Sequence, residues 1–550
     1  MQRVIFRNNV PVARKQGRAM ICPASHKACC AKKRLSGWCG SLFAFVLITS
    51  GCTTVGPDYK KPSAEVERQW LEVSDSKVTN EALVDPRWWS VFNDPVLNEL
   101  IESAREQNLT LRSAGLRILA ARAQLGIALG SKYPQLQQFS GDASRVKLSK
   151  NDPDNIPLLD DSFALYNLEF TLAWEIDFWG RFKRLIESAA ASLDASVANY
   201  DTVMVALVAE VARTYALIRT FEERLRIARE NVTTQQQSLK IADARFQGGA
   251  VSELDVQQAK SLLNNTQSTI PVLEISLKQL KNALAVLLGL TPGQLGDRLG
   301  PGAIPTAPPQ VALGMPQDLV RRRPDIRRAE RTLAAQSAEI GFAVSDLYPA
   351  FTLGGVIGLG ISSIAGKGAG DLFNSDSLSG NAFFGFKWDV FNYGRLKNNV
   401  RLQDALFQQL LIDYQNLVLQ AQGEVEDAIV AYLRTHDQVR FLGQAVSAAK
   451  RSVDLATIQY REGATDFNRV LTTMDVLLQQ QDTLAAATGS IATNLIATYN
   501  ALGGGWQVRG DTKIDDLIPE QTKVEMRERT KYWKKVLPVS GSTSVKSKTE

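Results

Sequence analysis

Apolar residues recur three and four positions apart through two long segments of the chain, a spacing that places them on one face of an α-helix. Residues 182–247 contain neither Gly nor Pro, and residues 395–462 are interrupted only by Gly423 and Gly443. At ~1.5 Å per residue, each segment can form about 100 Å of helix. The apolar stripe of the first segment consists of Ile186, Ala190, Leu193, Val197, Tyr200, Met204, Leu207, Val211, Tyr215, Ile218, Phe221, Leu225, Ala228 and Val232. This stripe predicts long helices with coiled-coil seams.

A glycine interrupts each long helix, and a second helical pattern follows. The interruptions are Gly249 and Gly463. The return helices are predicted over 252–288, with a kink near Pro271, and over 466–502. Each half of the chain therefore contains a long helical hairpin.

Strict alternation of apolar and polar residues predicts strands between the helices. The pattern is clearest over 164–176 and 382–390, recurs with several glycines over 351–361, and is weaker over 136–146. Aromatic residues near the strand ends and charges on the opposite face are typical of a membrane barrel. A soluble sandwich with one wet face is the alternative. The polar segments 150–161 and 365–380 are predicted to be exposed connections.

The two halves repeat one plan with a period of about 214 residues. Residues 111–134 align with 326–349. Both aligned segments begin within helices, predicted over 95–131 and 317–346, and both end in Tyr-Pro just after those helices. Proline cannot continue a helix, so the structure changes at that point. A unit of this length indicates duplication of a half-structure of helix, strand pair and hairpin rather than a solenoid repeat.

Four strands are too few to close a membrane barrel, which needs at least about eight. An open sheet edge in hydrocarbon leaves N–H and C=O groups unpaired, at a cost of several kcal/mol each. Identical copies must therefore pool their strands. Three copies would supply about twelve strands, with the polar strand faces lining the lumen and the long helices forming a matching tube.

The charge distribution argues against nucleic-acid binding. The net charge is +6, but residues 1–51 hold nine of the 63 basic residues and none of the 57 acidic ones. From Cys52 onward the net charge is about −3, which leaves no basic surface to neutralise a phosphate backbone.

The beginning of the chain has the order of a secretory signal peptide: a basic stretch, a short apolar run and small residues before Cys52. These small residues resemble the bacterial lipobox, although Thr49 stands where an aliphatic residue is usual. We expect Cys52 to be lipidated, and Thr53 after it favours the outer membrane. A plain signal peptide is the alternative. Another alternative interpretation of this region is a metal cluster formed by Cys22, His26, Cys29 and Cys30.

These patterns divide the chain into five parts. They are a signal peptide over 1–51, a lipid-anchored extended segment over 52–90, a first repeat over 91–310, a second repeat over 311–510 and a polar tail over 511–550. The predicted fold class is mainly α with transmembrane β, in two tandem repeats.

Several motifs complete a resemblance to the TolC-type outer-membrane efflux family, in the NodT-like lipoprotein branch that serves resistance-nodulation-division (RND) pumps. They are Gly56–Pro62, Asp85–Trp89, Phe92–Pro95, Gly314–Pro316 and Arg321–Ile326, together with the two hairpin turns. The resemblance implies a homotrimer with a β-barrel of about twelve strands on a periplasmic α-barrel. It also implies partners: a periplasmic adaptor (membrane fusion) protein, an inner-membrane RND transporter and outer-membrane lipid.

The implied function is that of an exit duct, which passively conducts small molecules from the pump to the outside. A conduit for type I protein secretion would share this fold and is the alternative. A periplasmic coiled-coil scaffold is another, and it would stay soluble without the lipid at Cys52.

The hairpin turns are the candidate docking tips for the adaptor. By resemblance they comprise Gly248, Gly249, Ala250 and Val251 in the first repeat and Gly463, Ala464 and Thr465 in the second. In the family, an acidic residue commonly follows each turn. The first repeat keeps it as Asp255, whereas the second repeat has Arg469 at the equivalent position. We expect Asp255 to pair with Arg469, or with another arginine of the turns, in a neighbouring copy and hold the pore shut. Glu253 and Asp466 are further gate candidates. Solvated turn charges are the alternative.

The residues offer little for catalysis. His436 is the only histidine after Cys52 and is expected on a solvated helix face, and no His/Cys group has the spacing of a zinc site. No phosphate-binding loop of the Walker type is present. We therefore expect no enzymatic activity, no cofactor and no metal, so the energy for export must come from a partner.

Overall fold

A computed structural model describes residues 54–79, 86–149, 151, 162–296, 298–308, 310–510 and 512–537. The signal peptide predicted over 1–51, the lipidation site at Cys52 and nearly all of the connection 150–161 lie outside these residues.

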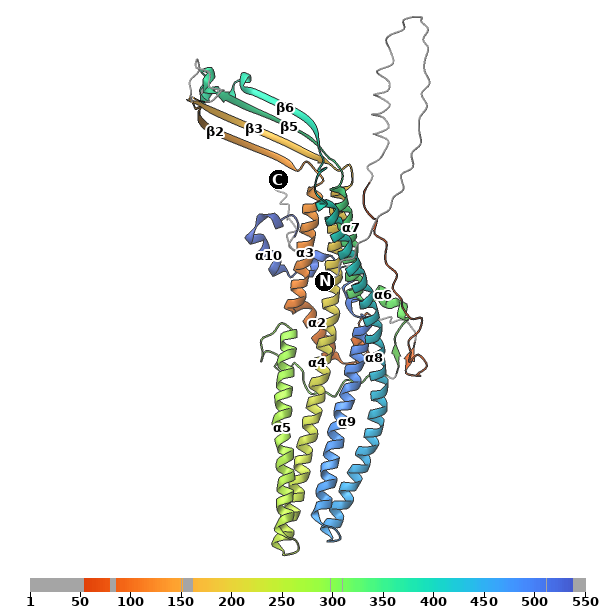
Figure 1. Ribbon diagram of the computed structural model, residues 1–550. Helices are drawn as coiled ribbons and strands as arrows, with labels where there is room; N and C mark the ends of the chain where they lie inside the picture. The colour runs from red at the N-terminus through yellow and green to blue at the C-terminus, as the bar shows by residue number, and fades with distance from the viewer. Residues whose placement is uncertain are drawn as a thin grey trace, which may run out of the picture. The chain divides into compact units, whose positions relative to one another are not determined.

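Two helical hairpins of equal dimensions form nearly half of the described chain (Figure 1). The long helices α4 (Arg181–Gln247) and α8 (Arg395–Arg461) have 67 residues each. The return helices α5 (Glu253–Leu287) and α9 (Phe467–Ala501) have 35 residues each, and α5 continues through Pro271. The predicted hairpins are therefore confirmed to within a residue or two at every end. No described helix has both the length and the apolarity needed to cross a membrane.

Each helix predicted ahead of a strand pair is divided in two, which corrects the predictions over 95–131 and 317–346. In the first repeat, α2 (Pro95–Gln107) and α3 (Leu109–Gly130) meet at Asn108. The Asn108 side chain accepts a hydrogen bond from Leu111 N and donates one to Leu287 O, both at 2.9 Å. An asparagine in this position starts a new helix instead of extending the old one.

The second repeat has its own break. The 3₁₀ turn η2 (Pro316–Asp318) leads into α6 (Leu319–Arg322), and α7 (Pro324–Ser345) follows. Arg323, with φ −69° and ψ 119°, is the extended residue between the two helices. The ring of Pro324 disfavours helical geometry at the residue before it, so the chain has to break at this position.

Four antiparallel strands form one sheet in the order β2-β3-β5-β6. They are β2 (Leu136–Lys147), β3 (Ser162–Ile176), β5 (Ala350–Ser362) and β6 (Leu378–Lys387). The strand predicted over 382–390 therefore lies too far along the chain. Val390 N bonds to Trp388 O at 3.0 Å in a tight turn, which ends the strand and directs the chain into α8. The connection predicted over 365–380 contains η4 (Ala369–Phe373) and η5 (Ser375–Ser377), and η3 (Ser363–Ala365) precedes them.

The helices adjoining the strands follow the same lateral order as the sheet. The chain passes from α3 into β2, from β3 into α4, from α7 into β5 and from β6 into α8. Contacts join α3 to α4, α4 to α7, and α7 to α8. The sheet and the helical layer therefore end in the same two edges, one formed by β2 with α3 and the other by β6 with α8.

The main apolar core joins the two repeats. The fully buried Trp88, in η1 (Trp88–Phe92), stacks on Tyr499 of α9 with ring centroids 5.2 Å apart. The predicted coiled-coil seam assumed one partner helix for the apolar stripe of α4. In the structure α4 packs against three helices, α5, α7 and α9. Eight of the fourteen predicted members of the stripe are buried, namely Tyr200, Met204, Leu207, Val211, Tyr215, Ile218, Leu225 and Ala228.

The N-terminal segment 54–79 lies along both repeats. Arg184 of α4, with a side chain 2% exposed, donates to Val55 O at 3.1 Å, to Gly56 O at 3.2 Å and to the Asp58 carboxylate at 2.8 Å. The Arg184 guanidinium lowers the pKa of Asp58. Farther along, β1 (Val78–Thr79) pairs in parallel with β4 (Val311–Ala312). The segment therefore ties the start of the chain to the junction between the repeats.

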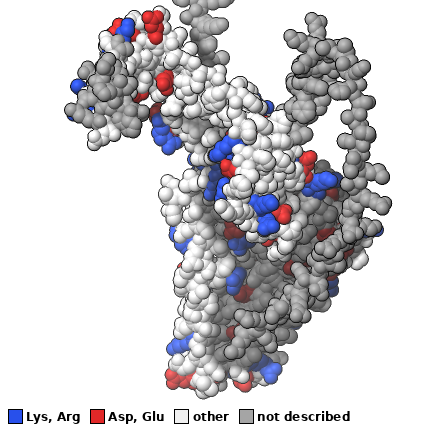
Figure 2. All heavy atoms as spheres, turned by 45° about the horizontal axis from the view of Figure 1, so that its top comes forward, with Lys and Arg blue, Asp and Glu red and all other residues white. Residues whose placement is uncertain are grey.

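Within the tail predicted over 511–550, the described residues 512–537 are folded. The tail follows η6 (Trp506–Arg509) and contains η7 (Ile514–Leu517), α10 (Glu520–Arg529) and η8 (Lys531–Trp533). Ile518 and Leu537 pack on Leu119 of α3. Asp515 accepts a hydrogen bond from Arg122 at 2.7 Å. On the face that Figure 2 shows, basic and acidic side chains are interspersed rather than gathered by sign.

Replacing Arg184 by Met should release the N-terminal segment. Loss of the hydrogen bonds from a buried guanidinium should lower the free energy of unfolding by about 2 kcal/mol. Amide hydrogen exchange at residues 55–59 should become faster. The matched control is Arg213→Met on the same helix, because Arg213 is 50% exposed and pairs with Glu210 alone. Exchange at 55–59 that is unchanged in Arg184→Met would contradict this account.

Candidate functional site

The sheet has one apolar face and one largely polar face. The apolar face carries cross-strand rows such as Phe139–Phe170–Ile357, Leu168–Leu359–Leu378 and Trp174–Leu353–Phe384. The opposite face carries the rows Gln138–Thr171–Val356–Asn381, Ser140–Glu169–Gly358–Ser379 and Asp142–Asn167–Gly360. This confirms the predicted alternation and defines two surfaces of different chemistry.

The apolar face is uncovered in the single chain. Phe139 is 68% exposed, Phe384 65% and Phe386 69%. In addition, β2 and β6 each pair with one strand only among the described residues, so each presents a free backbone edge. An exposed apolar face with open edges marks a surface that another molecule or a lipid phase covers.

Apolar side chains also line the edge helices. On α3 the exposed residues Leu109, Leu116 and Ile127 lie seven and eleven residues apart, on one face of the helix. On α8, Leu402, Ile412 and Leu419 are each more than half exposed. These rows lie on the two helices that flank the open strand edges, so the sheet and the helical layer are unpartnered along the same sides.

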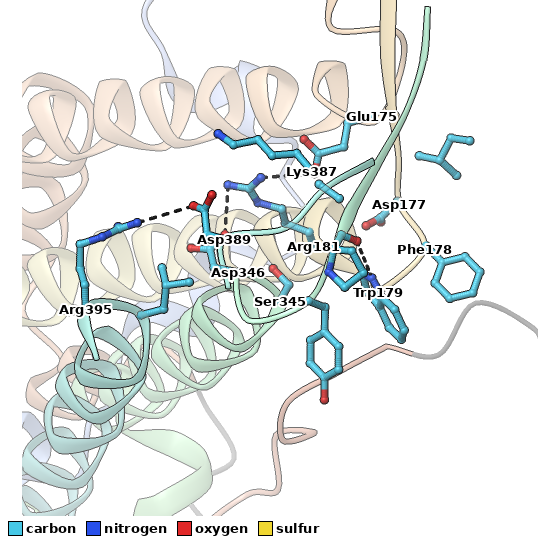
Figure 3. Close-up of a pocket in the computed structure, with 15 residues that line it drawn as sticks. Glu175, Asp177, Phe178, Trp179, Arg181, Ser345, Asp346, Lys387, Asp389 and Arg395 are labelled. Atoms are coloured by element: carbon cyan, nitrogen blue, oxygen red, sulfur yellow. Dashed lines mark hydrogen bonds and ion pairs between the residues drawn. The ribbon is translucent and has the colours of Figure 1, made fainter. Parts of the chain in front are cut away.

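A pocket of about 320 Å³ lies where strands give way to helices, lined by both repeats (Figure 3). Gly180, at φ +75°, allows the sharp turn from β3 into α4. The Asp177 carboxylate then accepts hydrogen bonds from Phe182 N at 3.0 Å and Lys183 N at 2.9 Å, which caps α4. Gly394, at φ +84°, has the corresponding position before α8.

An ion pair and a hydrogen bond across the pocket tie the repeats together. Arg181 contacts Glu175 at 3.3 Å and Asp346, at the end of α7, at 3.4 Å. The Trp179 indole donates to Pro349 O at 2.9 Å and stacks on Tyr348 with ring centroids 4.6 Å apart. These paired charges and stacked rings identify the pocket as a structural joint.

The two hairpin turns have one geometry. Gly249, at φ +71°, is followed by Ala250, whose N–H bonds to Arg245 O at 2.9 Å. Gly463, at φ +77°, is followed by Ala464, whose N–H bonds to Gln459 O at 2.8 Å. Both are Schellman turns, which require the left-handed conformation at the glycine. Gly248, Gly249, Ala250, Gly463 and Ala464 are exposed, and Val251 and Thr465 are half-buried.

Polar contacts join the two turns within one chain. The Tyr460 hydroxyl donates to Asp255 Oδ2 at 3.1 Å. Burial and the neighbouring Asp255 raise the pKa of Tyr460 to about 12, so the hydroxyl keeps its proton. Arg245 donates to Tyr460 O and to Arg461 O, and its guanidinium carbon lies 4.8 Å from the centroid of the Tyr460 ring. Sequence reasoning missed Arg245 because nothing near it in the chain marks a partner about 215 residues away.

The remaining gate candidates have local roles in the single chain. Asp466 caps α9 by accepting from Arg469 N at 3.2 Å, and Glu253 accepts from Gln257 at 3.0 Å. The Arg469 side chain is exposed. Asp255 bonds to Tyr460 in the chain itself, so pairing between Asp255 and Arg469 of another copy stays a prediction.

One expectation about His436 is wrong. The side chain is half-buried rather than solvated, with its ring edge-on to Tyr432 at a centroid distance of 4.7 Å. Burial lowers the pKa of His436. In the part of the chain that the structure describes, no three His, Cys, Asp or Glu residues are grouped to hold a metal ion.

Comparison with known proteins agrees with this architecture. The family model for outer membrane efflux proteins matches residues 100–290 and 315–504. The pyoverdine export outer membrane protein OpmQ of Pseudomonas putida is 35% identical over 81% of this chain and 93% of its own. Nodulation protein T of Rhizobium leguminosarum bv. trifolii is 32% identical over 84% of this chain and 96% of its own.

A solved structure shows the same fold. The outer-membrane channel OprN superposes with a TM-score of 0.77 at 30% identity and covers 82% of this chain and 99% of its own. The two matched segments of the family model fall on the two repeats. The chain belongs to the outer membrane efflux protein family.

Proposed function

We propose that the chain forms the outer-membrane exit duct of a tripartite efflux system of the RND type, through which small molecules pass without chemical change. The observation that carries this proposal is the shared lateral edge: β2 with α3 ends one side of the protomer, and β6 with α8 ends the other. One interface between copies can therefore pair both layers at once. Family membership supports the same function.

Closure follows from joining these edges in a ring. β2 of one copy pairs with β6 of the next, which satisfies the free N–H and C=O groups. The same step brings the apolar row of α3, with Leu116 and Ile127, against the row of α8, with Ile412 and Leu419. A homotrimer gives a β-barrel of about twelve strands above a tube of helices.

The two faces of the sheet set the orientation of the barrel wall. The face with Phe139, Phe384 and Phe386 lies against outer-membrane lipid, and the polar face lines the lumen. A lipid on Cys52 anchors the start of the chain. The hairpin turns form the periplasmic end, where a periplasmic adaptor docks and connects the duct to an inner-membrane RND transporter that supplies the energy.

The relatives favour export of small molecules over type I protein secretion. OpmQ is named for the export of pyoverdine. The structure of this chain offers no separate observation in favour of polypeptide export.

A charge on the edge helix should prevent ring formation. Ile127→Glu places a carboxylate in each contact between α3 and α8, and burying an unpaired charge should cost at least about 3 kcal/mol per contact. We expect the variant to be mainly monomeric by light scattering in detergent, whereas the wild type is trimeric. Arg117→Glu, on the same helix but off the apolar row, serves as the control. A trimeric Ile127→Glu protein would refute this edge as the interface.

The gate hypothesis predicts a leakier pore in Arg469→Ser. If Asp255 of one copy pairs with Arg469 of the next, three exposed pairs contribute about 0–1 kcal/mol each, so the restraint is modest. We expect a higher open probability in planar bilayers, and Asp255→Asn should act in the same direction. Arg451→Ser removes an exposed arginine of α8 away from the turns and should leave conductance unchanged. An unaltered closed state in Arg469→Ser would mean that these are solvated turn charges.

A further inference from the structure

The polar face of the sheet carries charge of one sign over most of its length. Its ionisable residues in the described strands are Asp142, Glu169, Glu175 and Lys387. Glu175 and Lys387 lie at the helical end of the strands, where Glu175 is paired with Arg181 at 3.3 Å. The middle of the face therefore has two ionisable groups, both carboxylates.

These two carboxylates lie close together without a cation. Asp142 of β2 is the cross-strand partner of Asn167, two positions before Glu169 on β3. Asn167 donates to Asp142 at 3.3 Å, and no described Lys or Arg pairs with Asp142 or Glu169. Arg145 and Lys147 of β2 occupy odd positions and so belong to the apolar face.

Glycines of the second repeat leave room beside the carboxylates. Gly358 is the cross-strand neighbour of Glu169, and a Cβ added to Gly358 would lie 2.9 Å from Glu169 Cγ. A Cβ added to Gly360 would lie 3.1 Å from Asn167 Oδ1. Both carboxylate side chains are exposed. Solutes that pass along this face can therefore reach them directly.

We propose that Asp142 and Glu169 form the charge filter of the barrel, which makes the duct select cationic and neutral solutes over anionic ones. The proposal rests on the proposed function, because it needs the polar face to enclose a lumen. In a ring of copies each protomer contributes one of each residue. Rings of carboxylates concentrate cations and repel anions in a channel, and the low-dielectric wall strengthens the effect.

The filter belongs to the first repeat alone. The positions in the second repeat that correspond to Asp142 and Glu169 hold Val356 and Phe383. At the level of Asp142 and Glu169, acidic sectors formed by β2 and β3 therefore alternate around the lumen with sectors of β5 and β6 that carry no charge at this level. An apolar or neutral molecule has an uncharged path past the filter, while an anion meets the same unfavourable field in every copy.

The test is the reversal potential of the purified full-length protein in planar bilayers under a gradient of potassium chloride. We expect the wild type to prefer potassium over chloride. The isosteric double variant Asp142→Asn/Glu169→Gln should reduce the permeability ratio by about threefold or more, since fixed charge in a cleft enriches counter-ions by tenfold or more. A reversal potential does not depend on the size of the current, so a mostly closed pore can be measured.

A matched control removes two carboxylates elsewhere. Glu99→Gln/Glu106→Gln changes exposed residues of α2 by the same charge and should leave the ratio unchanged. A nonselective wild type, or a double variant with unaltered selectivity, would overturn the charge filter and leave the proposed duct intact. Absence of any current, in the wild type and in Arg469→Ser alike, would overturn both the duct and the filter.

Discussion

Backbone hydrogen bonds at the edges of a four-stranded sheet constrain everything else in this molecule. An N–H or C=O group removed from water without a partner costs free energy comparable to a lost hydrogen bond, and β2 and β6 each present a row of such groups. The helical layer has unpartnered apolar rows on α3 and α8 at the same sides. A partner that covers only the sheet or only the helices would leave half of each side exposed. A further copy of the same chain can cover both, because its own edges have the complementary order.

The proposed ring needs a chain whose sheet and helical layer keep a fixed relation to each other, and polar ties between the repeats provide this rigidity. Arg181 at the start of α4 reaches Asp346 at the end of α7. Asp201 of α4 contributes a further tie, since it accepts a hydrogen bond from Arg509 of the second repeat at 2.9 Å. Because these contacts lie between the strands and the hairpins, the joint fixes how one layer continues into the other.

The sequence was sufficient to predict the elements but not their divisions or long-range ties. Periodicity and two glycines placed both hairpins to within a residue or two, because an unbroken apolar stripe leaves no other regular structure available. The break at Asn108 was missed because an asparagine able to cap a helix also occurs inside helices. The hydrogen bond from Asn108 to Leu287 O, which holds the break, is a long-range contact. At the turns, Asp255 was identified from its motif. The Tyr460 hydroxyl and Arg245 were not, since their partners lie in the other repeat.

Divergence between the repeats explains why the turns contact each other as they do. Phe246 and Tyr460 are equivalent positions, as are Asp255 and Arg469. Phe246 is 40% exposed, whereas Tyr460 is 2% exposed and uses its hydroxyl to donate to Asp255. Two identical turns packed side by side could not form this bond, because a second phenylalanine has no donor. A second aspartate would also add a like charge that disfavours close approach. Duplication therefore supplied the shared helical frame, and substitution at matched positions made the two halves complementary.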